Sequence, residues 1–245
     1  MKKIFLFDLD GTLAESAQII NDDMIKQLDI LKKNSHEIGI VGGGDFIKMS
    51  KQINNKIIFD HIFSECGSVY YRYNNIIHDY EFIYKNNITD HSEYYHIDRL
   101  VKKTLEFLSH VDYTLSGNFI DRRNGLMYIS LIGMQATNSE RERFMDLDKK
   151  YAYRERLMNI LIEYNTSTQL DILLGGSVGI AIYPKEWNKV QVLHTIKKSD
   201  YDSIYYFGDR YLENGNDYAL LHADGVTGIK VDSPEDTIHY LRGTS

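Results

Sequence analysis

Continuous apolar runs alternate with helical periodicity over the first 65 residues. The stretch 3–8 is apolar without alternation, which is typical of a strand buried in a parallel sheet. Apolar residues at helical spacing follow between 20 and 31, and 37–41 is a second short apolar strand. A helix ending near Asn54 and the apolar stretch 57–65 come next. This strand–helix–strand order predicts a parallel α/β sheet.

The middle of the chain has a different pattern. Residues 69–82 predict a hairpin around Asn74-Asn75, and Asn124-Gly125 marks a second hairpin. Residues 93–109 are helical in pattern, and Thr137–Glu140 resembles the capping box of another helix. A pair of apolar strands within 169–184 follows. We therefore expect residues 82–184 to form an antiparallel α+β insert.

The α/β pattern resumes after Trp187. A helix is predicted near 188–198, strands at 203–209 and 227–231, and a closing helix over 233–241. The predicted fold is a Rossmann-like parallel-sheet core, residues 1–81 and 185–245, with an inserted α+β cap domain, residues 82–184. That layout suits an enzyme whose site lies between core and cap.

Composition narrows the choice of partners. The chain has 245 residues and a formal net charge of −7, which argues against nucleic-acid binding because that needs a basic surface. Its one cysteine, Cys66, permits no internal disulfide, and its nine histidines form no zinc-type cluster. It contains no run of about 18 apolar residues and no apolar leader. We expect a soluble cytoplasmic protein without a membrane or nucleic-acid partner.

Two aspartates, Asp8 and Asp10, end the first apolar run. Residues two apart on an extended chain project to the same side, and the carboxyl ends of parallel strands are where open α/β sheets bind ligands. Gly11 permits a tight turn whose amides can hold an anion. One carboxylate can attack phosphorus while the other transfers a proton. Mg²⁺ would offset the repulsion between these carboxylates and a phosphate.

A second acidic group follows the strand at 203–209. Asp209 ends that apolar strand, so it is expected to meet Asp8 on a neighbouring strand end, and Asn216 and Asp217 follow on the loop. A single aspartate at a strand end is often only a turn or helix-cap residue. The combination of both acidic motifs makes that alternative the weaker one.

The first motif, "FLFDLDGTL", resembles the haloacid dehalogenase-type phosphotransferases. The stretches "FDHIFSECG", "FIDRRNGLMYISLIG", "YPKEWNK" and "YYFGDRYLENGND" are similar, in order and spacing, to eukaryotic-type phosphomannomutases. This resemblance covers nearly the whole chain. The first and last motifs identify only the superfamily, whereas the cap motifs and "YPKEWNK" are more specific.

The resemblance implies roles for the core residues. Asp8 would be the nucleophile that forms an aspartyl phosphate, and Asp10 the general acid/base. Lys189 would hold the transferring phosphoryl group, although from the residues alone a solvated helix lysine fits better. The Mg²⁺ ligands implied are Asp8, the Asp10 carbonyl, Asp209, Asn216 and Asp217.

In the cap, the resemblance implies that Arg123 and Arg141 clamp the sugar's distal phosphate. Arginine suits that task because its planar fork is bidentate. The alternatives are a charge at a strand edge for Arg123 and an i,i+4 surface pair for Arg141. The resemblance also implies a homodimer through the cap.

Several substrate positions depart from the family pattern. Polar residues expected there are replaced by Ala17, Gly44, Cys66, Met134, Gly179 and Ala181. Gly179 and Ala181 lie two apart on a predicted strand and therefore share a face. With Met134 they make the substrate face less polar and remove hydrogen-bond partners for sugar hydroxyls, which changes selectivity. The chemical residues are thus retained more fully than the substrate residues.

Three hypotheses follow. The first is a Mg²⁺-dependent phosphotransferase that interconverts mannose 6-phosphate and mannose 1-phosphate, with a hexose phosphate substrate and a hexose bisphosphate activator. The second is a sugar-phosphate phosphatase of the same superfamily, in which water accepts the phosphoryl group. The third is a non-catalytic interaction module on the same fold, which the retained acidic residues and Lys189 argue against.

Overall fold

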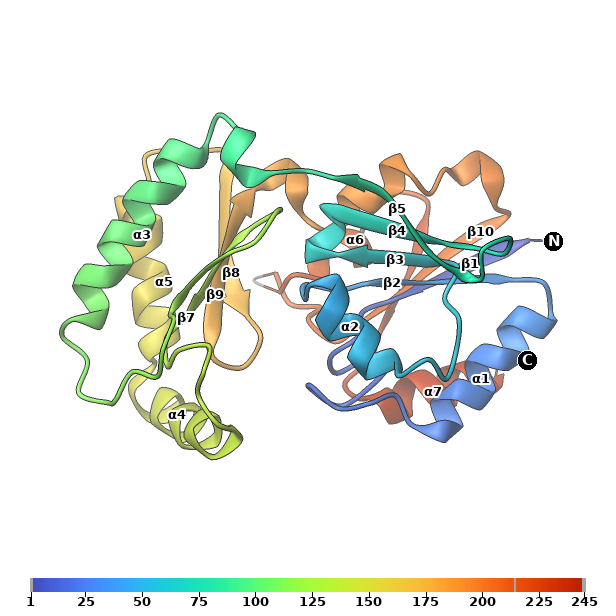
Figure 1. Cartoon of the computed structure of the whole chain (residues 1–245), viewed down its shortest axis with the longest axis horizontal. Helices are drawn as coiled ribbons and strands as arrows, with labels where there is room; N and C mark the ends of the chain where they lie inside the picture. The colour runs from blue at the N-terminus through green and yellow to red at the C-terminus, as the bar shows by residue number, and fades with distance from the viewer. Residues whose placement is uncertain (1, 214, 244–245) are drawn as a thin grey trace. The chain divides into compact units, whose positions relative to one another are not determined.

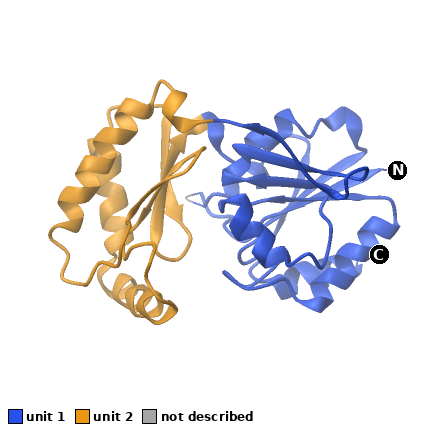
Figure 2. Ribbon diagram, in the orientation of Figure 1, with its two compact units in different colours: residues 1–86, 186–245 blue, residues 87–185 orange. Residues whose placement is uncertain are grey.

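A computed structural model describes residues 2–213 and 215–243. The chain divides into two compact units, unit 1 with residues 1–86 and 186–245 and unit 2 with residues 87–185 (Figure 2). Among the described residues, no helix combines the length and apolar character needed to cross a membrane.

Unit 1 is a seven-stranded sheet with the strand order β11-β10-β1-β2-β3-β4-β5 (Figure 1). The strands are parallel from β11 to β3, and β4 and β5 are antiparallel. Their bounds are β1 Lys3–Phe7, β2 Glu37–Val41, β3 His61–Ser64, β4 Val69–Asn74, β5 Asp79–Lys85, β10 Ser203–Gly208 and β11 Val226–Lys230. The parallel α/β core predicted from the apolar runs is confirmed.

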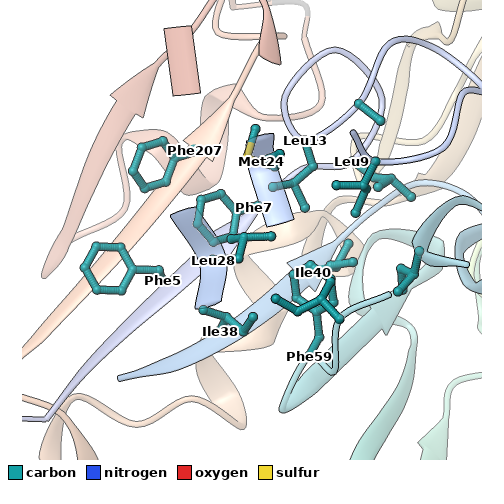
Figure 3. Close-up of a cluster of buried hydrophobic side chains, with 14 of the residues drawn as sticks. Phe5, Phe7, Leu9, Leu13, Met24, Leu28, Ile38, Ile40, Phe59 and Phe207 are labelled. Atoms are coloured by element: carbon teal, nitrogen blue, oxygen red, sulfur yellow. The ribbon is translucent and has the colours of Figure 1, made fainter. Parts of the chain in front are cut away.

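Two apolar clusters cover the two faces of this sheet. On one face, Phe5 and Phe7 pack with helices α1 (Asp22–Lys33), α2 (Phe46–Ile53) and α7 (Pro234–Gly243) (Figure 3). On the other face, Ile4 and Leu6 pack with the short helix α6 (Tyr218–Leu221) and the 3₁₀ segment η4 (Lys189–His194). Alternate residues of the run 3–7 point to opposite faces of the sheet, and both faces are covered. This explains why the run is apolar throughout.

Unit 2 is a four-stranded antiparallel sheet with the order β6-β7-β9-β8. Its strands are β6 Ile120–Arg122, β7 Met127–Ser130, β8 Leu170–Gly175 and β9 Gly179–Pro184, and its helices are α3 Tyr94–Leu108, α4 Asn138–Tyr151 and α5 Tyr153–Tyr164. Helix α5 packs on the sheet and against α3 (Figure 1). The hairpin at Asn124-Gly125 and the capping box of Thr137 and Glu140 are both present.

One predicted domain boundary and one predicted helix were wrong. Residues 82–85 belong to β5, which pairs with β4 as far as Lys85, so they lie in unit 1 and not in the insert. The predicted helix at 188–198 is instead a set of short 3₁₀ turns, of which η4 begins after Asn188. The Asn188 side chain caps this turn by accepting a hydrogen bond from the Val190 amide. Single turns of this kind satisfy few backbone groups, so burial of Lys189, Gln191 and Val192 determines the conformation.

Candidate active site

Parallel pairing brings two strand ends together in unit 1. Strand β1 lies beside β10, and the Asp8 amide donates to the Phe207 carbonyl at 2.9 Å. Asp8 and Asp209 therefore follow adjacent strands at the same edge of the sheet. One carboxylate oxygen from each of Asp8, Asp209 and Asp217 lies within 4.8 Å of the others. The structure thus brings together acidic residues that the sequence places about 200 positions apart.

Lys189 is fully buried among these carboxylates. Its Nζ lies 2.5 Å from Asp8 Oδ1 and 2.7 Å from Asp217 Oδ1, and it also donates to Tyr206 Oη at 3.1 Å. The alternative of a solvated helix lysine is therefore wrong. A buried ammonium in direct contact with the proposed nucleophile is also well placed to neutralise a phosphoryl group.

Burial dominates the electrostatics of this cluster. It raises the pKa of Asp8 to about 8, with Lys189 opposing the shift and the charges of Asp217 and Asp209 adding to it. Burial also raises the pKa of Asp209 to about 6, together with the charge of Asp217. Burial opposes the charge on Lys189. The negative charges of Asp217 and Asp8 outweigh it and hold the pKa of Lys189 well above the usual range, so Lys189 keeps its proton. Asp8 and Asp217 thus share one ammonium, and Asp209 pairs with Arg210 at 3.2 Å.

The donor set suits a hard cation such as Mg²⁺. Asp209 Oδ1 is buried and has no hydrogen-bond partner among the residues that the structure describes. Gly11 makes room for this carboxylate, since a Cβ there would lie 2.6 Å from Asp209 Oδ2, and its φ of +91° also suits glycine. An unpartnered carboxylate oxygen within an acidic cluster is the environment that an oxygen-ligated divalent cation requires. The residues present therefore fit Mg²⁺.

Asp217 is engaged by protein donors on both oxygens. Oδ1 accepts hydrogen bonds from Lys189 and from Tyr206, and Oδ2 accepts one from the Arg210 amide at 2.9 Å. Its contacts favour a role in holding Lys189. The neighbouring Asn216 lies near Gly43, where a Cβ would be 3.8 Å from Asn216 Nδ2.

The Asp10 side chain points to a different set of partners. Its Oδ1 accepts from the Ala17 amide and from Gln52 Nε2, and its Oδ2 pairs with Lys48 Nζ, each at 2.8 Å. Burial opposes ionisation, but Lys48, the Ala17 amide and Gln52 outweigh it and hold the pKa of Asp10 below its usual range. Ala17 has a φ of +60°, so this loop is held in a left-handed turn that aims its amide at Asp10.

Gly44 and Cys66, at two of the altered substrate positions, have structural surroundings of their own. A Cβ on Gly44 would lie 3.2 Å from Lys48 Cδ, so the missing side chain leaves space for Lys48. Cys66 is buried, has a φ of +59°, and its carbonyl accepts from Gln191 Nε2 at 3.0 Å. Gln191 thereby ties this turn to the segment that carries Lys189.

In unit 2, Arg123 stacks on Tyr128, whereas Arg141 bonds to backbone carbonyls. The Arg123 guanidinium lies 4.7 Å from the centre of the Tyr128 ring and pairs with Asp121 at 2.8 Å. Burial raises the pKa of Tyr128, and the charges of Arg123 and Arg141 oppose that shift. Arg141 donates to the carbonyls of Met134 and Ala136, both at 3.0 Å, instead of forming an i,i+4 surface pair.

Tyr128 also explains the surroundings of Gly179 and Ala181. It pairs with Ala181 across β7 and β9, and its hydroxyl donates to the Gly175 carbonyl at 3.0 Å. A Cβ on Gly179 would lie 2.4 Å from Tyr128 Oη. The Tyr128 ring and the Ile129 carbonyl, also 2.4 Å from that Cβ position, fill the space that a side chain at 179 would need, which explains the glycine there.

Sequence reasoning missed Lys48, Tyr128 and Tyr206 at these positions. Strand alternation gave a usable signal for Tyr206, because it stands two residues before Gly208 and so shares its face. Tyr128 stands two residues before Ser130 on a predicted strand and shares its face, but neither residue was expected in the site. Lys48 ends the stretch "GIVGGGDFIK", which is similar to the family pattern, but no role was assigned to it.

Solved structures with a similar fold define the class. The chain aligns with IMP-nucleotidase of Plasmodium falciparum at a TM-score of 0.62 and 15% identity, over 98% of this chain and 67% of that one. It aligns with the trehalose-6-phosphate phosphatase C-terminal domain of C. albicans at a TM-score of 0.62 and 18% identity, covering 100% and 93%. These likenesses place the chain in the haloacid dehalogenase-like fold class.

Sequence comparison then identifies the family. The profile described as eukaryotic phosphomannomutase matches residues 24–244. Relatives named phosphomannomutase are 37% identical in Encephalitozoon cuniculi, covering 96% of this chain and 91% of the relative, and 32% identical in Schizosaccharomyces pombe, covering 98% and 93%. The chain belongs to the eukaryotic phosphomannomutase family and is an enzyme of that class.

Proposed function

We propose that this enzyme is a Mg²⁺-dependent phosphotransferase that interconverts mannose 6-phosphate and mannose 1-phosphate through a phosphorylated Asp8. The observation that carries the proposal is the buried Lys189 ammonium, which joins Asp8 to Asp217 beside the unpartnered oxygen of Asp209. Family membership supports the substrate, since the relatives are named phosphomannomutases.

The chemistry assigns one task to each residue. Asp8 attacks phosphorus, so an Asp8–phosphorus bond forms while the bond from phosphorus to the sugar oxygen breaks. Asp10, once protonated, gives its proton to the departing sugar oxygen and takes one from the hydroxyl that attacks in the return step. Lys189 stays charged and neutralises the transferring group.

The metal and distal-phosphate assignments are also part of the proposal. Asp8, the Asp10 carbonyl, Asp209 and Asn216 would hold Mg²⁺, and Asp217 would lie next to these ligands. The bound ion would supply positive charge to the phosphoryl oxygens. Arg123 and Arg141 would bind the phosphate that is not being transferred, a role supported by the family resemblance.

The test of the nucleophile is Asp8→Asn. This change keeps shape and most hydrogen bonding but removes the attacking carboxylate, so we expect phosphoryl transfer to fall by at least about a thousandfold with the fold intact. Turnover is followed by ³¹P NMR, and folding by circular dichroism. Unchanged turnover in a folded variant would refute the assignment.

Phosphatase activity is the second candidate function. It is favoured by the Tyr128 ring over Gly179, together with Ala181 and Met134, which leave this face with few partners for sugar hydroxyls. Mannose 1-phosphate with and without a hexose 1,6-bisphosphate distinguishes the two. Isomerised product that needs the bisphosphate supports the mutase, whereas release of inorganic phosphate alone supports the phosphatase.

The remaining proposals concern the protein's cellular location and its self-association. We propose a cytoplasmic location, supported by the single free cysteine, Cys66, which is buried. We also propose self-association through unit 2, on the basis of family resemblance alone. Sedimentation of the intact chain checks it, because a monomer at working concentration would contradict a homodimer.

A further inference from the structure

The buried ammonium of Lys189 has a complete set of acceptors. A lysine side chain carries three N–H donors and accepts nothing. Here the acceptors are Asp8 Oδ1 at 2.5 Å, Asp217 Oδ1 at 2.7 Å and Tyr206 Oη at 3.1 Å. Two are the carboxylates of the acidic cluster, and the third is a phenol that belongs to neither acidic motif.

Backbone geometry puts Tyr206 within reach of this ammonium. It lies on β10 between β1 and β11, opposite Leu6 and Gly228, and shares a face with Gly208. A Cβ on Gly208 would lie 2.6 Å from Asp217 Cγ. Because Gly208 has no side chain, the Asp217 carboxyl can pass over the strand and contact Tyr206.

The phenol uses both of its hydrogen-bonding functions. It donates to Asp217 Oδ1 and accepts from Lys189 Nζ. Tyr206, Lys189 and Asp217 are each 0% exposed. The hydroxyl therefore links the Lys189 ammonium to the Asp217 carboxylate at a buried position, where no solvent can substitute for it.

We infer that Tyr206 is a positioning residue for phosphoryl transfer: its hydroxyl holds the Lys189 ammonium on Asp8 Oδ1. This inference rests on the proposed function, in which Lys189 neutralises the transferring group. With the ammonium bound to Oδ1, the other oxygen of Asp8 is the one that attacks phosphorus. Without the hydroxyl, one buried N–H loses its acceptor and Asp217 loses a donor, so the ammonium can turn away from Asp8.

The experiment compares Tyr206→Phe with Tyr205→Phe. Tyr205 is the neighbour on the same strand, packs against Phe5 on the opposite face, and controls for loss of a phenol from β10. For Y206F we expect kcat to fall roughly tenfold, the effect of leaving a buried donor unpaired. KM for mannose 1-phosphate should stay within about twofold, because a fully buried hydroxyl does not touch substrate. Y205F should keep both constants near wild type.

A rise in KM at constant kcat, or wild-type kcat in Y206F, would overturn the inference. So would an equal fall of kcat in Y205F, which would indicate a general effect on the strand. Circular dichroism spectra of both variants should match wild type at the assay temperature.

A double-mutant cycle on urea unfolding is independent of turnover. Y206F should lower the folding equilibrium constant roughly tenfold in the wild-type background and distinctly less in a Lys189→Met background, which has no ammonium to leave unpaired. Equal effects in both backgrounds would contradict coupling between Tyr206 and Lys189. If the wild-type chain turns over no sugar phosphate, the proposed function fails, whereas this cycle still reports the contact.

Discussion

At the scale of single residues, Lys48 changes the interpretation of the Asp10 loop. Ala17 provides only its amide to Asp10, where the family resemblance leads one to expect an arginine side chain. Lys48 brings a cation to the same carboxylate from helix α2, over the space left by Gly44. The loop therefore retains a positive charge, supplied by a different element.

Replacing Lys48 should raise the pKa of Asp10 and remove a contact that orients its carboxylate, so the proton transfer assigned to Asp10 should be impaired. For Lys48→Ala we expect kcat to fall roughly tenfold. This is a fraction of the rate enhancement that a positioned general acid/base usually provides. Steady-state turnover of mannose 1-phosphate is the measurement. Lys51→Ala is the matched control, since Lys51 is exposed on the same helix. Equal activity of the two variants would show that Asp10 does not depend on Lys48.

At the scale of elements, polar side chains link the strands of unit 1. Glu37 at the start of β2 accepts from Tyr201 and contacts His61 Nε2 at 3.0 Å on β3, and His61 Nδ1 contacts Tyr70 Oη at 2.8 Å on β4. The hydrogen bond with His61 is the largest influence on Glu37 and lowers its pKa well below the usual range, with Lys2 and Tyr201 adding to it against burial.

This shift predicts a pH dependence of stability. A carboxyl whose pKa is lower in the folded state stabilises the protein above its unfolded pKa of about 4.5, and that stabilisation is lost as the pH falls. Urea midpoints of wild type and Glu37→Gln should therefore differ most near about pH 6, and the difference should narrow steadily as the pH falls below about 4.5. Glu81→Gln, at an exposed glutamate of β5, is the control. A constant difference across this range would contradict the prediction.

Strands β7 and β9 give a second prediction at this scale. A side chain at 179 would overlap the Tyr128 ring, so Gly179→Ser should destabilise the protein by about 1–3 kcal/mol, the usual cost of overpacking. Truncating the ring in Tyr128→Ala should remove only the part of that cost due to the ring, because the Ile129 carbonyl lies 2.4 Å from the same Cβ position and stays in place. Urea unfolding of both single variants and the double variant measures it. Ala181→Ser controls for added polarity on the same strand without a new Cβ. Additive effects of the 128 and 179 changes would show that the two sites are independent.

At the scale of the whole molecule, the sequence predicted elements better than contacts. Apolar periodicity predicted the strands of unit 1, and the Asn-Gly signal predicted the β6–β7 hairpin, because both depend on local chemistry. It missed the end of β5, since the alternation of a hairpin strand does not tell where its pairing stops. Asp8 and Asp209 were predicted to meet because parallel strand ends align. Alternation placed Tyr206 on the face of Gly208, but the contacts of Tyr206 and Tyr128 depend on side-chain packing that spacing does not encode.

The split of unit 1 across the sequence has a consequence for its biosynthesis. Strand β1 leaves the ribosome before unit 2 is made, and its partner β10 follows only after unit 2. Until then one edge of β1 has no neighbour, although it is a central strand of the finished sheet. The nascent chain must keep this edge from pairing elsewhere while residues 87–185 are synthesised. Asp8 is thus made well before Lys189, Asp209 and Asp217, and it meets them only after unit 2 has been synthesised.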